Sequence, residues 1–179
     1  MHGWLAFSRT IDRLNEWIGR GLLWLVLLAS LVSAGNALVR KALGMSSNAW
    51  LEIQWYLFAA MVLLAAGYTL KHNGHVRIDV LSGRWSTRAR AWIDLFGTIF
   101  FLLPLCGLLI ALSWTDFTTS LRSGELSPDA GGLLRWPVRA LIPFGFMLLA
   151  AQGLSEMIKR IAFLRGLAPL TLERPTEKV

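Results

Sequence analysis

The residues with the clearest potential for chemistry stand directly after a long apolar stretch. His72 and His75 are three positions apart, and Asp79 follows four positions later. Two imidazoles and a carboxylate at such spacing can bind a transition metal. The other interpretation is that they are polar residues at the end of a membrane helix. We favour this second interpretation, because two nitrogens and one carboxylate beside Gly74 are weak support for a metal site.

The remaining sequence shows no arrangement typical of a catalytic centre. The single cysteine, Cys106, lies in an apolar stretch where a thiol is a poor nucleophile, and one cysteine excludes an intramolecular disulfide and a cysteine-based zinc site. The apolar stretches contain no histidine to bind haem. No nucleophile elbow or phosphate-binding loop is present. We therefore expect no enzymatic activity, no cofactor and no metal.

Hydrophobic residues make up 55% of the 179 residues, and they gather into four blocks. Each block approaches the roughly 20 residues that a helix needs to cross the hydrocarbon core of a bilayer. Lipid requires every backbone polar group to be bonded internally, and the blocks lack the alternation of barrel strands. The sequence predicts an all-α, integral membrane four-helix bundle forming a single membrane domain over residues 1–179. The expected spans are about 20–40, 50–71, 92–115 and 137–158.

The +7 net charge is distributed unevenly between the two sides of these spans. Thirteen Lys and Arg residues lie on the side of the N-terminal segment, the second loop and the C-terminal tail, against five on the other side. The positive-inside rule therefore predicts that both termini are cytoplasmic. A pI near 10.5 could suit a nucleic-acid binder, but the basic residues of the second loop lie close to a span. We expect Arg84, Arg88 and Arg90 to contact anionic lipid headgroups.

The two ends of the chain differ from the spans. Residues 4–18 place apolar side chains at helical spacing, with Arg9, Asp12, Arg13 and Glu16 elsewhere on the helix. Two arrangements fit: an amphipathic helix lying in the membrane interface, or an extension of the first span. The predicted fold includes the interfacial arm, over residues 1–18. The polar segment 166–179 is expected to be a mobile tail.

Polar residues near the spans are candidates for contacts between helices or with another subunit. An ion relay requires ionisable groups near the bilayer centre, whereas these residues fall in its outer thirds. We therefore favour helix–helix or subunit contacts over ion transport by this chain alone. The residues are Asn36, Glu52, Gln54, Gln152 and Glu156.

Small residues and one proline add expectations about packing. Residues spaced four apart, such as Ala29, Ser33 and Ala37, or Gly145 and Gly153, allow close approach of membrane helices. Pro104 is expected to kink the third span near its middle.

An ordered set of motifs over residues 20–165 resembles a known family. The set comprises Trp50-Leu51-Glu52-Ile53-Gln54-Trp55-Tyr56, Asn73-Gly74-His75-Val76-Arg77-Ile78-Asp79, Gly124-Glu125-Leu126-Ser127-Pro128, Arg135-Trp136-Pro137 and Gln152-Gly153-Leu154-Ser155-Glu156. It is similar to the small membrane subunit (Q, DctQ-type) of tripartite ATP-independent periplasmic (TRAP) transporters. Many members carry two adjacent acids where this chain has only Glu52.

The resemblance implies a role in sodium-driven uptake of an organic acid across the bacterial inner (plasma) membrane. In such systems a periplasmic substrate-binding protein delivers the substrate, and a large membrane subunit moves it. The small subunit packs against the static scaffold of the large subunit and helps to brace it. We expect Asn36, Glu52 and Gln54, near the periplasmic side, to contact the large subunit or brace the bundle. We expect loop 116–135 to help form a docking surface. Membrane lipids are a further expected partner, and nucleic acid is not.

A self-associating small channel or exporter is the competing interpretation. It requires a polar, water-lining stripe through one helix, and no span shows such a stripe.

Overall fold

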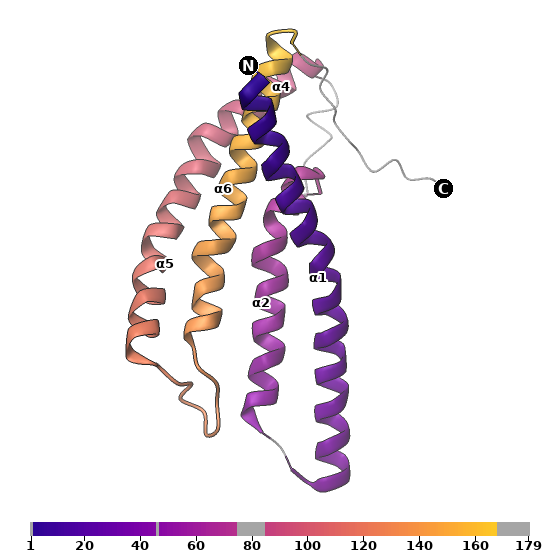
Figure 1. Cartoon of the computed structure of the whole chain (residues 1–179), viewed down its shortest axis with the longest axis vertical. Helices are drawn as coiled ribbons and strands as arrows, with labels where there is room; N and C mark the ends of the chain where they lie inside the picture. Colours follow the sequence, from indigo (N-terminus) through magenta and orange to yellow (C-terminus); the bar gives the residue numbers. More distant parts are fainter. Residues whose placement is uncertain (1, 46, 75–84, 168–179) are drawn as a thin grey trace, which may run out of the picture.

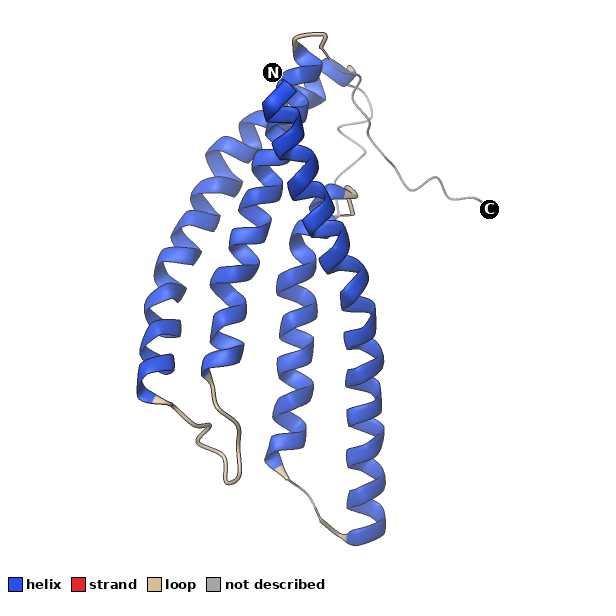
Figure 2. Cartoon of the chain, in the orientation of Figure 1, coloured by secondary structure: helices blue, strands red, loops and turns tan. Residues whose placement is uncertain are grey.

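A computed structural model of the chain describes residues 2–45, 47–74 and 85–167. Within these residues the elements are all helices, apart from one isolated antiparallel bridge between Leu126 and Leu134 (Figure 2). The elements are α1 (His2–Leu43), α2 (Asn48–Lys71), α4 (Thr87–Gly97), the π-helical η1 (Thr98–Leu102), α5 (Leu103–Ser123) and α6 (Trp136–Leu164). The predicted all-α class is confirmed.

Four helical segments are long and apolar enough to cross a membrane. Three of them are α1, α2 and α6, and the fourth is the continuous rod Thr87–Ser123 formed by α4, η1 and α5. The four expected spans each lie within one of these segments. The prediction of a multi-pass membrane protein is therefore confirmed.

The ends of the helices follow from local sequence. Ser86 caps α4 by accepting a hydrogen bond from the backbone nitrogen of Ala89 at 3.2 Å. Helices α1 and α5 are followed by Gly44 and Gly124, whose φ angles of 64° and 61° are favoured by glycine. Pro137 lies in the first turn of α6, where its missing N–H leaves no hydrogen bond unmade.

The third span changes its hydrogen-bonding pattern just before Pro104. The backbone nitrogen of Leu103 bonds to the carbonyl oxygen of Thr98, which is the five-residue spacing of a π-helix. Proline has no N–H to offer the carbonyl of Phe100 four residues earlier, so the regular pattern cannot continue there. The distortion expected near Pro104 takes the form of this π-helical turn.

The long helices lie side by side in the order α5, α6, α2 and α1 (Figure 1). Helix α6 packs against α1, α2, α4, η1 and α5. The helices converge at one end, which we call the terminal end: it contains the start of α1, α4 and the C-terminal end of α6. The opposite end, which we call the loop end, contains the C-terminal end of α1, the start of α2 and residues 124–135.

Residues 4–18 are part of α1 and not a separate arm. The helix runs without interruption from His2 to Leu43, so the structure has the second of the two arrangements left open by the sequence. No proline interrupts the chain around Gly19 and Gly21, and Ser8, Ile11 and Asn15 are buried. The first turns of α1 are helical because they pack against the bundle.

Two of the helix crossings depend on glycine. A Cβ atom at Gly145 of α6 would lie 2.8 Å from the carbonyl oxygen of Leu63 in α2. A Cβ atom at Gly67 of α2 would overlap the side chain of Asn15 in α1. Gly107, by contrast, has no atom of another helix within 4 Å of its Cβ position. The small-residue spacing in α6 therefore marks a real contact within the chain, whereas Ser33 and Ala37 of α1 are exposed.

The bundle buries polar residues and exposes apolar ones. Its fully buried side chains include Asn15, Ser120, Gln152 and Ser155. Large apolar side chains are exposed along all four membrane helices. This distribution suits a protein in lipid, where apolar groups are solvated and polar groups must find partners inside.

Candidate functional site

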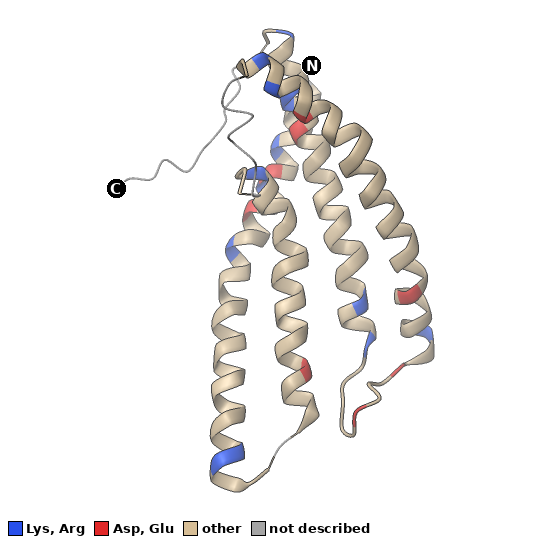
Figure 3. Cartoon of the chain, turned by 180° about the vertical axis from the view of Figure 1, so that it is seen from behind, with Lys and Arg blue, Asp and Glu red and all other residues tan. Residues whose placement is uncertain are grey.

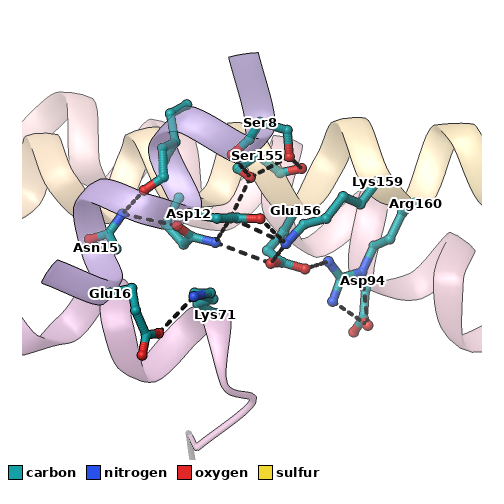
Figure 4. Close-up of polar contacts among 12 residues, drawn as sticks. Ser8, Asp12, Asn15, Glu16, Lys71, Asp94, Ser155, Glu156, Lys159 and Arg160 are labelled. Atoms are coloured by element: carbon teal, nitrogen blue, oxygen red, sulfur yellow. Dashed lines mark hydrogen bonds and ion pairs between the residues drawn. The ribbon is translucent and has the colours of Figure 1, made fainter. Parts of the chain in front are cut away.

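A buried polar cluster joins α1 and α6 at the terminal end (Figure 4). Gln152 of α6 is at its centre, with a relative exposure of 0%. Its side-chain oxygen accepts a hydrogen bond from Asn15 Nδ2 at 2.9 Å. Its side-chain nitrogen lies 2.8 Å from Asp12 Oδ1 and 3.2 Å from Glu156 Oε1, and donates to both. A single amide therefore joins two residues of α1 to α6.

One turn nearer the start of α1, two serines bring α1 and α6 close together. The Ser8 and Ser155 hydroxyls lie 2.7 Å apart, and both residues are buried. The Ser155 hydroxyl also lies 2.8 Å from Asp12 Oδ1 and can donate to it. Small hydroxyl side chains allow the helix backbones to approach while still forming hydrogen bonds, as is common between membrane helices.

Ion pairs extend this cluster to α4. Arg160, only 3% exposed, donates to Glu156 Oε2 at 2.7 Å and to Asp94 Oδ2 at 3.0 Å. Lys159 pairs with Asp12 Oδ2 at 3.2 Å and with Glu156. Each cation thus connects α6 to a carboxylate of another helix, Asp94 on α4 or Asp12 on α1. We call these residues the terminal cluster: Ser8, Asp12, Asn15, Asp94, Gln152, Ser155, Glu156, Lys159 and Arg160.

A second set of charges connects α1 to the end of α2. Glu16 Oε2 accepts a hydrogen bond from Lys71 Nζ at 2.7 Å and lies 2.9 Å from His72 Nε2. Glu16 Oε1 accepts from Arg20 at 3.0 Å. His72 is therefore a partner of a carboxylate, while His75 and Asp79 lie outside the described residues. Among the residues that the structure describes, no group of three His, Cys, Asp or Glu could hold a metal ion.

Helical spacing places the terminal cluster on facing surfaces. Ser8, Asp12 and Asn15 are four and three positions apart, so they share one face of α1. Gln152, Glu156 and Lys159 have the same spacing on α6, and Ser155 lies three positions after Gln152 on the same face. Gly67 leaves the space that the Asn15 side chain occupies.

At the loop end, three side chains of α2 hold residues 124–135. Asn48 Nδ2 donates to the carbonyl oxygen of Ala130 at 3.0 Å, and the Tyr56 hydroxyl donates to that of Leu134 at 3.1 Å. Between them, Glu52 Oε2 accepts from the backbone nitrogen of Leu133 at 2.7 Å. The three residues are four positions apart and form one stripe of α2, which we call the loop clasp.

The held loop also has internal contacts. The backbone nitrogen of Ser127 bonds to the carbonyl oxygen of Leu133, and that of Arg135 bonds to the carbonyl oxygen of Glu125, both at 2.9 Å. The Glu125 carboxylate accepts from Arg139 of α6 at 2.9 Å. These contacts give residues 124–135 a defined shape on the surface of the loop end.

The structure distributes the predicted contact residues between the two ends. Gln152 and Glu156 belong to the terminal cluster, and Glu52 belongs to the loop clasp. Asn36 and Gln54 are half-buried and form no hydrogen bond with another described residue, so their contact with a partner stays a prediction.

The three arginines expected at lipid headgroups have different positions. Arg88 donates to the carbonyl oxygen of Leu164 at the end of α6, at 3.3 Å. Arg90 donates to the carbonyl oxygen of Trp85 at 3.2 Å. Arg84 lies outside the described residues. Contact of this group with lipid stays a prediction.

The inward role of the first turns of α1 does not follow from their amphipathic pattern. That pattern places Asp12 on a polar surface, whereas Asp12, Ser8 and Asn15 face α6. A recognisable signal was present, since three short polar side chains repeat at helical spacing just before a charge-free span.

Replacing Glu52 by glutamine tests the loop clasp. We expect the Leu133 amide to exchange with solvent roughly three- to tenfold faster, because a hydrogen bond to a charged acceptor contributes about 1 kcal/mol more than one to a neutral acceptor. Hydrogen exchange measured by mass spectrometry checks this. Gln54→Ala on the same helix is the control and should leave exchange in residues 124–135 unchanged. Equal exchange in Glu52→Gln and the unsubstituted chain would contradict the clasp.

The charged residues of the described helices gather toward the two ends, with an uncharged region between them (Figure 3). No Asp, Glu, Lys, Arg or His occurs between Arg20 and Arg40, between Glu52 and Lys71, or between Arg139 and Glu156. The same holds between Asp94 and Asp116. The arrangement can lock helices together at both ends, and it places no carboxylate, amine, guanidinium or imidazole in the centre to form a relay.

Comparison with known proteins assigns most of the chain to one family. Residues 29–163 match the family model described as tripartite ATP-independent periplasmic transporters, DctQ component. Searches of curated proteins and of solved structures found no match.

Proposed function

Since this chain belongs to the DctQ family of TRAP transporter components, we propose that it braces the static scaffold of the large membrane subunit. The family consists of the small membrane component of these transporters and is not an enzyme family. Such transporters also contain a large membrane component and a periplasmic binding protein, and the small component is located in the inner membrane. We further propose sodium-coupled uptake of an organic acid as the activity of the whole complex.

The single observation that carries the bracing role is the separation of the charges from the middle of the spans. The terminal cluster and the loop clasp join helices or loops of this chain to one another. Between these two sets the four spans carry no Asp, Glu, Lys, Arg or His. The helices of such a chain are joined at both ends of the bundle, and their central parts offer no charged residues along which an ion could pass. This arrangement suits a structural subunit better than an ion-conducting one.

We assign the loop end to the periplasmic side, which follows from the charge asymmetry of the sequence. Residues 124–135 would then face the binding protein, or the part of the large subunit beside it. The tip is well placed for this, since Pro128, Asp129 and Ala130 are exposed while the loop clasp fixes the backbone behind them.

Affinity purification of the tagged chain from native membranes tests this function. We expect a large multi-span membrane protein to co-purify, identified by mass spectrometry. Liposomes containing both subunits, supplied with the binding protein, should take up an organic acid in sodium but not in choline medium. Liposomes with this chain alone should take up none.

Two outcomes would contradict the proposal. Uptake by the chain alone would support the self-associating channel instead. Full uptake by the large subunit without this chain would remove the bracing role while leaving the family assignment intact.

A further inference from the structure

The outward face of the first half of α1 carries a stripe of arginine and tryptophan. Five residues of this face follow one another at intervals of three or four positions, so they lie on one side of the helix. They are Arg9, Arg13, Trp17, Arg20 and Trp24. We call them the arginine–tryptophan stripe. The face lies opposite Ser8, Asn15 and Gly19, which contact the bundle.

No other described part of the chain packs over the stripe. Trp17 and Trp24 are 78% and 71% exposed, and the Arg20 side chain is 76% exposed. Glu16 bonds to Arg20, but the same carboxylate is shared with Lys71. The stripe therefore keeps a net positive charge.

The stripe lies at the boundary between a charged and an apolar region. Beyond Arg20 the helix carries no charge until Arg40. The side chains that follow on the exposed surface are apolar, with Leu23 at 71%, Leu27 at 49% and Leu31 at 61% exposure. Tryptophan favours the headgroup layer of a bilayer, and arginine near that layer attracts anionic lipid.

We propose that the arginine–tryptophan stripe is a binding site for an anionic phospholipid. Arg13 and Arg20, which flank Trp17, hold the phosphate of the headgroup, Trp24 lies at the glycerol level, and the acyl chains follow the leucines of α1. Arg9 lies about 16 Å along the helix from Arg20 and adds to the positive charge above the headgroup. An acidic protein segment would match the arginines, but it would not match the continuous apolar surface below them. This inference does not depend on the transporter assignment or on the orientation of the chain.

Native mass spectrometry of the full chain in detergent tests the site, with phosphatidylglycerol and phosphatidylcholine of identical acyl chains as probes. We expect phosphatidylglycerol to bind at least tenfold more tightly. The triple variant Arg9→Gln, Arg13→Gln, Arg20→Gln should bind the two lipids with equal affinity, because the charge that distinguishes them is gone. The corresponding triple Arg→Lys variant should keep most of it, because the charge remains.

A matched control removes the same number of charges at the loop end. Arg40→Gln, Lys41→Gln, Arg122→Gln changes three exposed cations and should leave the lipid preference unchanged. An equal loss in both triple Gln variants would show a response to net charge alone and overturn the site. A stripe variant that keeps the lipid preference but no longer co-purifies with the large subunit would identify a protein interface and also overturn it.

Discussion

Replacing Arg160 by methionine is expected to lower the free energy of unfolding by about 3 kcal/mol. Arg160 is 3% exposed and donates to carboxylates on two helices, Glu156 on α6 and Asp94 on α4. Methionine fills similar space, but it removes the positive charge that balances the buried Glu156 carboxylate. The value is at the lower end for a broken buried ion pair, because Lys159 still contacts Glu156.

Reversible unfolding in mixed detergent micelles, followed by circular dichroism, measures this effect. The matched control is Arg165→Met, an exposed cation just beyond α6 whose loss should cost less than about 0.5 kcal/mol. Arg160→Lys should fall between the two, because it keeps the charge but loses the forked donor geometry. Equal stability of Arg160→Met and Arg165→Met would refute the structural role of the ion pairs.

Replacing Gln152 by leucine is expected to lower the free energy of unfolding by about 2–3 kcal/mol. The substitution removes one acceptor and two donor contacts of a fully buried side chain, with Asn15, Asp12 and Glu156 as the partners. Asn15 Nδ2 retains only a 3.4 Å contact with the carbonyl oxygen of Ile11. The cost comes mainly from buried polar groups that lose their partners.

This substitution should also act locally, because Gln152 joins the first turns of α1 to α6. Hydrogen exchange should increase in residues 4–18 more than in α5, which packs against α6 and contributes no residue to the terminal cluster. Gln54→Leu is the control, since that glutamine is half-buried on α2 and has no hydrogen bond with a described residue. Unchanged exchange in residues 4–18 would indicate that the serine and ion-pair contacts suffice to hold α1.

The first half of α1 shows how a lipid environment alters the meaning of an amphipathic pattern. In water, the apolar residues of such a helix face the protein interior. Here Asp12 and Asn15 face the bundle, while Phe7 and Trp17 are 52% and 78% exposed. The α6 residues that Asp12 and Asn15 contact are themselves polar, so hydrogen bonds join the two helices here, with Ile11 also buried beside them.

The four membrane helices and the fold class follow from the amino-acid sequence without any tertiary contact. Length and hydropathy decide whether a segment crosses a bilayer, because the transfer free energy accumulates over consecutive residues and needs no tertiary contact. The first span, for example, can be recognised from the absence of charged side chains between Arg20 and Arg40. The motifs around Glu52 and Gln152 likewise indicated the family, which the family model over residues 29–163 confirms.

Which polar residues meet depends on how the helices cross in three dimensions. The hydroxyls of Ser8 and Ser155 are 147 positions apart in the chain and 2.7 Å apart in space. Such a pair depends on where α1 crosses α6, and that crossing depends on single positions such as Gly67, which leaves room for Asn15. Periodicity gives the face of a helix on which a residue lies, but it does not give the helix that this face will contact. The terminal cluster could therefore be assembled only in three dimensions.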